Sequence, residues 1–274
     1  MPNAAARWIL LLPDSDPFGR LLARSLARPG RSVELAASPA TLECPAMAVI
    51  DLSLPKADDW LRGLKLAREG EKTGVVGLLS ADVKDSERRL AQSAGTIRVR
   101  PDRELREPFS HVDVACACEQ LAAEHADRPG LRTLAIEYVP DLVLQDEAAR
   151  LIESRLTACG LPEPSCHVFV SGVREALDNA RLHGACPQKP ADRARVWLEA
   201  DQIQIMIAIA DDGAGLALQQ LAGSGETPLA TARRRNKAGR PGGLGLHIMR
   251  LTADEVRYEP DCKRVMLVKW LAQP

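Results

Sequence analysis

The stretch Glu175-Ala-Leu-Asp-Asn179-Ala-Arg-Leu-His183 lies at the end of a long segment with helical periodicity. In an α-helix of 3.6 residues per turn, positions i, i+4 and i+8 share one face. We therefore expect Glu175, Asn179 and His183 to project together. An asparagine on such a face can offer its amide oxygen to Mg²⁺, which prefers hard oxygen ligands and shares them with phosphates. A solvated polar stripe would show the same spacing, and this stretch taken alone favours that simpler interpretation.

Two glycine-containing motifs follow in the same half of the chain. Asp211-Asp-Gly213-Ala-Gly215 comes directly after an apolar run, where an acidic group can accept a hydrogen bond from an exocyclic amine and glycines permit close backbone approach. Residues 242–249 (GGLGLHIM) lead into a helix, whose first N–H groups and positive dipole end favour phosphate. Each motif is weak alone. Together, in this order and separated by a polar segment with a basic stretch at 233–240, they predict a nucleotide site.

These three motifs resemble those of the GHKL (Bergerat-fold) ATPases. The boxes of that family are matched, in order, by Glu175 and Asn179, by Asp211-x-Gly213-x-Gly215, and by Gly243-x-Gly245. The segment is most similar to the anti-sigma-factor serine kinases, because residues 242–257 (GGLGLHIMRLTADEVR) and the hairpin that follows resemble the end of those proteins. The resemblance extends over residues 131–270.

The resemblance implies an ATP-dependent and Mg²⁺-dependent protein serine/threonine kinase. It implies that Glu175 is the general base, that Asn179 holds Mg²⁺ and that Asp211 binds the adenine amine. The other implied nucleotide-binding residues are His183, Gly213, Gly215, Gly243, Gly245 and Leu246. Relatives often carry a basic residue just before the histidine, where this chain has Leu182. A phosphate contact could therefore have moved to Arg181 or to the basic stretch 233–240, which could form a lid or remain a solvated loop.

A polar stretch with a Pro-Gly breaker, 124–130, predicts a linker between a domain at 1–123 and a domain at 131–274. In the first half, apolar runs alternate with amphipathic stretches, which predicts a doubly wound parallel sheet. Its expected strands are 8–12, 46–50, 74–79 and 96–99, and its expected helices are 18–26 and 112–123. The second half predicts an α/β sandwich with strand 131–139, helices 145–159, 165–183 and 244–251, and hairpins 194–210 and 255–270. Within it, Gly160 ends one helix, Ser165 caps the next, and Asp201 marks a turn.

The first half resembles a response-regulator receiver domain, which implies a flavodoxin-like fold. Asp51-Leu-Ser-Leu-Pro55 follows an apolar run and looks like the phospho-accepting aspartate with its proline turn. The resemblance matches Asp14 to an acidic metal ligand, Ser80 to the conserved hydroxyl, and Arg100 to the lysine before proline. Arginine spreads its charge over a plane and does not simply replace a lysine. Two interpretations stay open: phosphorylation of Asp51, or a degenerate domain used for docking or dimerisation.

Composition sets the remaining expectations. The formal net charge of −1 argues against a dedicated nucleic-acid or membrane-surface protein, and the sequence predicts a cytoplasmic one. The seven scattered cysteines indicate reduced structural thiols. By resemblance, the partners are a STAS-domain anti-anti-sigma protein, a sigma factor and a second copy of the chain. The alternatives are a histidine kinase using His111 or His125, and a non-catalytic nucleotide-gated protein that sequesters a partner.

Overall fold

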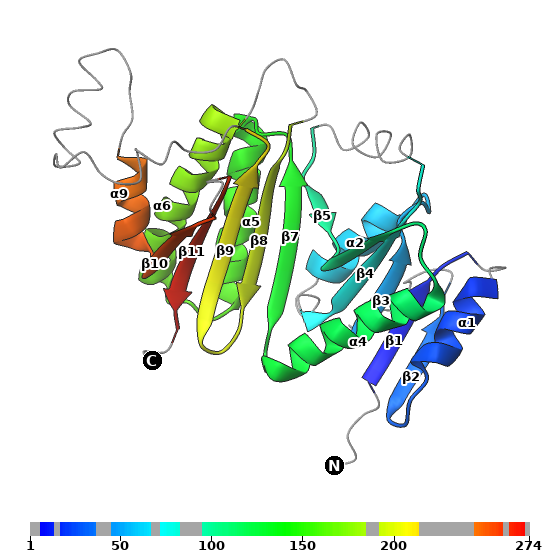
Figure 1. Cartoon of the computed structure of the whole chain (residues 1–274). Helices are drawn as coiled ribbons and strands as arrows, with labels where there is room; N and C mark the ends of the chain where they lie inside the picture. The colour runs from blue at the N-terminus through cyan, green and yellow to red at the C-terminus, as the bar shows by residue number, and fades with distance from the viewer. Residues whose placement is uncertain are drawn as a thin grey trace. The chain divides into compact units, whose positions relative to one another are not determined.

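The structure is a computed structural model, which describes residues 6–13, 17–36, 45–66, 72–82, 95–184, 192–213, 244–259 and 263–271. The chain forms two compact units (Figure 1). Unit 1 comprises residues 1–93 and 98–135, and unit 2 comprises residues 94–97 and 136–274. No helix in the described ranges is both long enough and apolar enough to cross a membrane.

Unit 1 contains a five-stranded sheet in which every pairing is parallel, as the sequence predicts. The strand order is β2-β1-β3-β4-β6. The strands are β1 (Ala6–Leu11), β2 (Arg31–Leu35), β3 (Met47–Asp51), β4 (Gly74–Leu79) and β6 (Arg103–Arg106). Because the strands are parallel, the residues that follow β3, β4 and β6 lie at one edge of the sheet.

In the part of the chain that the structure describes, the helices that accompany this sheet are α1 (Pro17–Leu26), α2 (Ala57–Leu66) and α4 (His111–Asp127). Side chains of α1 and α4 share a core with Trp8 and Met47 of the sheet. The Arg31 guanidinium lies 3.6 Å from the Trp8 ring centroid and forms a bidentate ion pair with Glu119 of α4. Apolar packing, a cation–π contact and an ion pair therefore fix α4 on the sheet.

One charged side chain of unit 1 is completely buried. Lys65 of α2 has no exposed surface, and its Nζ donates to Asp102 Oδ2 (3.0 Å), the Thr73 carbonyl (3.0 Å) and Thr133 Oγ1 (2.8 Å). Asp102 Oδ2 also accepts from the Val75 amide (2.8 Å). This network compensates the buried charges and connects α2 to two strands.

The second sheet has the order β10-β11-β9-β8-β7-β5, with antiparallel pairing from β8 to β10. Its strands are β5 (Arg98–Arg100), β7 (Arg132–Tyr138), β8 (Ala194–Ala200), β9 (Gln204–Asp211), β10 (Glu255–Tyr258) and β11 (Arg264–Trp270). The helices of unit 2 within the described ranges are α5 (Leu142–Ala158), α6 (Glu163–Asn179) and α9 (Gly245–Thr252), and a π-helical turn, Ala180–Gly184, continues α6. Helices α5 and α6 lie behind strands β8, β9 and β11 in Figure 1.

The two faces of the second sheet differ because strand side chains alternate. Ile207 and Ile209 of β9, with their partners Leu198 and Val196 on β8, are at most 2% exposed and form the helix-covered face. The opposite face, which we call the open face, carries half-buried side chains such as Trp197. Arg264 lies over the Trp197 ring, 4.5 Å from its centroid.

Several elements differ from the sequence predictions. The sequence analysis did not predict three elements, β2, β6 and α2. Strands β2 and β6 are short and polar and lie at the edges of the sheet, so they lack the apolar run that marks a strand in the sequence. Strand β5, expected in the parallel sheet, pairs with β7 in the second one. Helix α4 runs to Asp127 and includes the start of the expected linker. Ser165 does not cap α6, because the helix begins after Pro162, where proline is well tolerated.

Candidate functional site

Helix α6 carries the first predicted motif. Its buried side chains recur at helical spacing and are Cys166, Phe169, Val170, Val173, Ala176 and Leu177. This stripe fixes the rotation of the helix against the sheet. Glu175 and Asn179, one turn apart and both half-buried, are left on a flank of the helix. The expectation that these two side chains share one face of a helix is met.

The start of α9 comes close to these two side chains. A methyl group added to Gly245 would lie 2.8 Å from Glu175 Oε2 and 3.7 Å from Asn179 Nδ2. A side chain at this position would have to displace the Glu175 carboxylate, the far end of that side chain, so glycine lets the backbone pass beside it undisturbed. The first and third motifs, about 70 residues apart in the sequence, therefore meet at one place.

A second glycine explains why α9 packs so closely against α6. A side chain at Gly172 would overlap Thr252 Oγ1 at the end of α9. Thr252 Oγ1 is held in turn by hydrogen bonds to the carbonyls of Ile248 (2.9 Å) and Met249 (3.3 Å). Met249 is fully buried in this contact. The Gly172–Thr252 contact thus sets the distance at which Gly245 faces Glu175.

The environment of Glu175 alters its acidity. Burial raises the pKa of the Glu175 carboxyl, and the negative charge of Asp178 raises it further. A carboxylate with a raised pKa is a better proton acceptor than an ordinary glutamate. The residue therefore has the chemical character that a general base needs.

The second motif lies at the end of β9. Asp211 Oδ1 accepts a hydrogen bond from the Gly213 amide (2.8 Å), and the Asp211 amide donates to the Lys263 carbonyl (3.3 Å). Asp211 has the same parity along β9 as Ile207 and Ile209, so it belongs to the helix-covered face. Glu175, Asn179 and Asp211 are thus carried by elements on the same side of the second sheet.

Arg181, one of the two candidates for a displaced phosphate contact, is bound to neighbouring side chains in the structure. Its Nε donates to Gln145 Oε1 of α5 (2.9 Å), and its Nη2 donates to Asp178 Oδ1 (2.9 Å). Arg174 likewise binds Asp146 of α5 (2.8 Å). These arginines join α6 and the turn that continues it to α5. Helical spacing places residues 174, 178 and 181 on one stripe, which could have indicated this.

Several predicted residues lie partly or wholly outside the described residues. They are Gly215, Gly243, Asp14 and the basic stretch 233–240. The backbone of His183 lies in the π-helical turn, whose wider spacing differs from the α-helical register that the sequence suggested. Leu246, in the first turn of α9, is half-buried.

The donors at this site suit a magnesium nucleotide. The amide of Asn179 and the carboxylate of Glu175 provide oxygen donors of the kind that Mg²⁺ takes. The Gly245 backbone begins a helix, and among the described residues no side chain caps its first amides. Within the same ranges, no group of three or more His, Cys, Asp and Glu residues is arranged to hold a metal. The two oxygen donors of Asn179 and Glu175 are therefore suited to a metal ion that takes its remaining ligands from phosphate and water.

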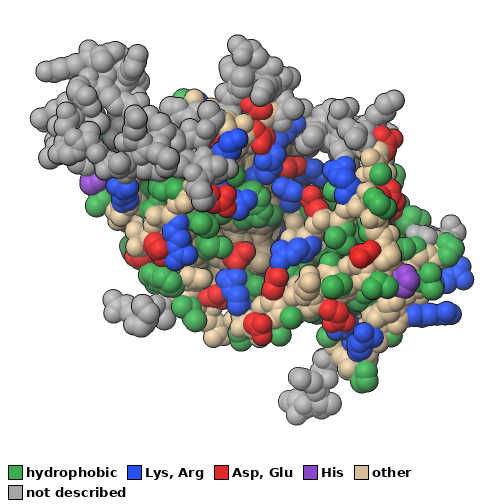
Figure 2. Space-filling model, in the orientation of Figure 1, with side chains coloured by type: hydrophobic (Ala, Val, Ile, Leu, Met, Phe, Trp, Pro, Cys, Tyr) green, Lys and Arg blue, Asp and Glu red, His purple; other side chains and the backbone are tan. Residues whose placement is uncertain are grey.

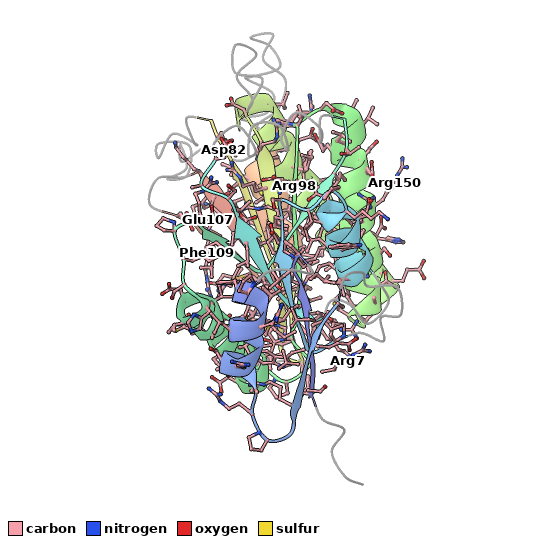
Figure 3. The ribbon with its side chains drawn as sticks, turned by 90° about the vertical axis from the view of Figure 1, so that its right-hand side faces the viewer. Arg7, Asp82, Arg98, Glu107, Phe109 and Arg150 are labelled. Atoms are coloured by element: carbon pink, nitrogen blue, oxygen red, sulfur yellow. The ribbon has the colours of Figure 1, made fainter. Side chains whose placement is uncertain are left out.

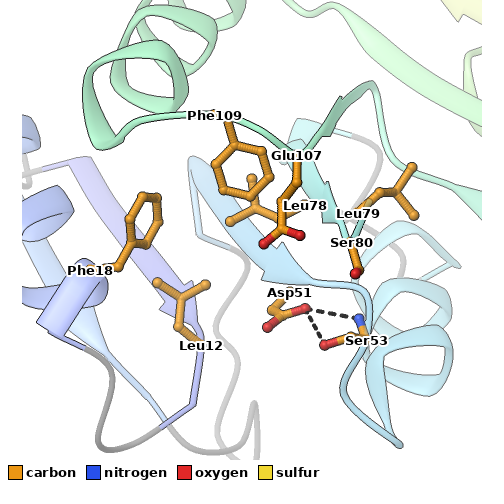
Figure 4. Close-up of a pocket in the computed structure, with 9 residues that line it drawn as sticks. All are labelled: Leu12, Phe18, Asp51, Ser53, Leu78, Leu79, Ser80, Glu107 and Phe109. Carbon is orange, nitrogen blue, oxygen red and sulfur yellow. Dashed lines mark hydrogen bonds between the residues drawn. The ribbon is translucent and has the colours of Figure 1, made fainter. Parts of the chain in front are cut away.

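Unit 1 has a pocket of about 430 Å³ at the edge where β3, β4 and β6 end (Figure 4). It is lined by Leu12, Phe18, Asp51, Ser53, Leu78, Leu79, Ser80, Glu107 and Phe109. Asp51 Oδ1 accepts from the Ser53 amide (2.9 Å) and the Ser53 hydroxyl (2.7 Å). The structure thus brings Asp51 and Ser80 together, as predicted.

Arg100 is not at this pocket. It lies in β5, and its guanidinium makes a bidentate ion pair with Glu104 (2.9 and 3.2 Å). Glu107, the residue before Pro108, lines the pocket beside Phe109 instead (Figures 3 and 4). Glu107 Oε2 accepts a hydrogen bond from the Ala81 amide (3.0 Å). At this pocket a carboxylate stands where a cation was predicted, and the sequence analysis missed it because the basic residue before Pro101 was the better match to a lysine before proline.

Comparison with known proteins agrees with the geometry of unit 2. Residues 140–269 match the family model described as the histidine kinase-like ATPase domain. A search of curated proteins finds no match to the chain. The matched segment contains α6, the end of β9 and the start of α9, which carry all three motifs. Residues 140–269 are a histidine kinase-like ATPase domain of the GHKL type, which points to an ATP-using, kinase-like enzyme.

Proposed function

We propose that this protein is an ATP-dependent protein serine/threonine kinase of the anti-sigma, partner-switching type. The observation that supports this best is the position of Glu175. Its carboxylate has a raised pKa, lies one turn from Asn179 and faces the glycine that begins α9. A proton acceptor beside a nucleotide site is what transfer to a protein hydroxyl requires.

Each residue of the site has a distinct role in this proposal. Asn179 would hold Mg²⁺, which neutralises charge on the phosphates when bound. Asp211 would accept a hydrogen bond from the adenine amine, and the glycines would let the backbone approach the phosphates. Glu175 takes the proton of the acceptor hydroxyl. The hydroxyl oxygen forms the new bond to the terminal phosphorus of ATP, and the bond from that phosphorus to the leaving ADP breaks. The partner proposed from the resemblance is a STAS-domain protein, with a sigma factor and a second copy of the chain as further partners.

We propose that unit 1 is a receiver-like regulatory domain that docks and does not accept phosphate. The parallel order β2-β1-β3-β4-β6 supports the fold, since flavodoxin-like sheets have the corresponding order. Glu107 favours the docking interpretation. An acyl phosphate on Asp51 needs a nearby cation, whereas Glu107 adds a second negative charge to the pocket.

The environment of His125 disfavours a histidine kinase that uses this residue. Burial lowers the pKa of His125, and its Nε2 atom is buried without a hydrogen-bond partner among the described residues. It lies near the buried Lys65–Asp102 pair, whose charges also act on its pKa. A phosphate acceptor must present a ring nitrogen to the nucleotide of its own or a neighbouring chain, and the half-buried His125 ring keeps its Nε2 atom enclosed.

The test is incubation of the protein with γ-labelled ATP, Mg²⁺ and a STAS-domain protein from the same genome. We expect acid-stable label on the partner, lost in Asn179→Ala and reduced at least ~100-fold in Glu175→Gln. Arg174→Gln, which removes the ion pair with Asp146 of α5 and leaves Glu175 and Asn179 in place, is the matched control and should retain activity. ATP binding without label on the partner would favour the sequestering protein. Acid-labile label on the chain itself would favour a histidine kinase.

A further inference from the structure

Two consecutive acidic residues end β9, and they occupy opposite faces of the sheet. Asp211 pairs with Ala194 of β8, and both belong to the helix-covered face. Asp212 follows one residue later and returns to the open face, where Arg195 lies opposite Ala210. The chemistry proposed for Asp211 takes place on one face, while the partners of Asp212 are on the other.

Asp212 is tightly bound on the open face. Arg195 Nη1 donates to Asp212 Oδ1 (2.8 Å), and Arg195 Nη2 donates to Asp212 Oδ2 (3.3 Å). The Arg193 amide also donates to Asp212 Oδ2 (2.9 Å). Burial alone would raise the pKa of Asp212, but the hydrogen bonds from Arg195 and Arg193 outweigh it and lower the pKa. A bidentate pair of this kind fixes orientation as well as distance.

Arg195 is itself held between two carboxylates. Its Nε lies 3.9 Å from Glu137 Oε2 on β7, and the Glu137 side chain is only 8% exposed. Three strands therefore contribute to one ionic row: Glu137 from β7, Arg195 from β8 and Asp212 from the end of β9. Figure 2 views the molecule in the orientation of Figure 1. On this side of the molecule, Lys and Arg side chains lie next to Asp and Glu side chains, among hydrophobic ones.

This row has a direct consequence for Asp211. The backbone from 211 to 213 forms a turn closed by the hydrogen bond from the Gly213 amide to Asp211 Oδ1. With Asp212 fixed on the open face, the peptide on either side of it cannot rotate freely, and Asp211 keeps one orientation. We infer that Arg195 is a positioning residue for recognition of the nucleotide base. It touches neither base nor phosphate and acts through Asp212.

This inference rests on the proposed function, since it assigns a role to the site that binds ATP. It predicts that loss of Arg195 weakens the contribution of the base to nucleotide affinity and leaves the contribution of the phosphates unchanged. ATP and inosine triphosphate separate the two contributions, because they share the triphosphate but inosine lacks the exocyclic amine. Calorimetric titration of the full chain with each nucleotide and Mg²⁺ measures both affinities.

In Arg195→Met we expect affinity for ATP to fall about tenfold, the equivalent of one hydrogen bond, and affinity for inosine triphosphate to change much less. The preference for ATP therefore shrinks. Arg195→Lys restores the charge beside Glu137 but not the bidentate geometry, so it should recover thermal stability without recovering the preference. Arg257→Met is the control, because Arg257 binds Glu255 and does not touch Asp212.

The outcomes are distinct. An unchanged ATP preference in Arg195→Met would overturn the positioning role while leaving the ATP site intact. Equal weakening of both nucleotides would also overturn it, since that indicates a general loss of structure. If the wild-type chain binds neither nucleotide, the proposed function fails and this inference fails with it. Should Arg195→Met not fold, Asp212→Asn, which keeps one acceptor oxygen, must show the same loss of preference.

Discussion

Lys65 illustrates how a single charged side chain determines local stability. It is fully buried, and its ammonium group is compensated by the Asp102 carboxylate and two further oxygens. Removal of one partner from a buried ion pair leaves the other charge uncompensated. We expect Lys65→Met to reduce the free energy of unfolding by about 3–5 kcal/mol. The double variant Lys65→Met/Asp102→Asn should lose less unfolding free energy than the single variant. Urea unfolding followed by circular dichroism measures the stability of both. A double variant less stable than Lys65→Met would contradict this account.

Asp254, between α9 and β10, gives a pH-dependent prediction. Its carboxylate accepts from Lys269 Nζ (2.7 Å) and the Trp270 amide (2.8 Å). Burial by itself raises its pKa, but these hydrogen bonds outweigh burial and lower the pKa in the folded state. The folded form therefore gains stability above the ordinary aspartate pKa and loses it as pH falls through the lowered one.

We expect Asp254→Asn to cost about 1 kcal/mol of unfolding free energy at neutral pH. The difference from wild type should shrink on acidification and vanish below the pKa of Asp254 in the folded protein. Thermal unfolding of both proteins across this range tests the sign. A difference that grows on acidification would contradict the assignment.

At the scale of elements, the contact between α6 and α9 decides whether the site exists. A side chain at Gly172 would overlap Thr252 Oγ1 and force α9 away from α6. We expect Gly172→Ala to cost about 1–3 kcal/mol and to weaken nucleotide binding, because Gly245 moves with α9. Gly172→Ala/Thr252→Ala should recover part of both losses. Gly63→Ala in α2 is the control, since nothing lies within 4 Å of the added methyl and stability should be unchanged or increased.

At the scale of the whole molecule, the two units carry sites that differ in how their carboxylates are balanced. The site in unit 2 sets the first amides of α9 beside its carboxylates, whereas the pocket in unit 1 has Asp51 and Glu107 with no Lys or Arg among its lining residues. We expect the full chain to remain unlabelled at Asp51 when incubated with labelled acetyl phosphate and Mg²⁺. Asp51→Asn should phosphorylate the partner protein at the wild-type rate. Acid-labile label on wild type that is missing from Asp51→Asn would contradict the docking role of unit 1.

The sequence predicted the elements whose signals are local. Strands β10 and β11 have their predicted bounds, and the β8–β9 turn forms where Asp201 Oδ1 accepts from the amides of Ile203 and Gln204 (both 2.9 Å). Gly160 ends α5 with a φ of 86°, as expected of a glycine at a helix end. In each case a few neighbouring residues contain the whole signal.

The sequence did not reveal the site features that depend on contacts between residues far apart in the chain. Arg100 and Glu107 each precede a proline, and only the pairing of β6 with β4 shows that Glu107 reaches the pocket. Likewise, Arg181 has the spacing to face either a phosphate or α5, and the position of Gln145 decides between them. The Arg195–Asp212 pair needs the β8–β9 register, which residue types alone do not specify.

The four tryptophans of the chain, which has only two tyrosines, give it a built-in optical readout. The four indoles divide evenly: Trp8 and Trp60 belong to unit 1, and Trp197 and Trp270 belong to unit 2. Trp8 is 3% exposed beneath Arg31, so its emission should be blue-shifted and shift to the red only when unit 1 opens. Trp197 lies under Arg264 and two residues from Arg195, where a cation can quench it. Intrinsic fluorescence can therefore follow nucleotide-dependent change in unit 2 and unfolding of unit 1 without an added label.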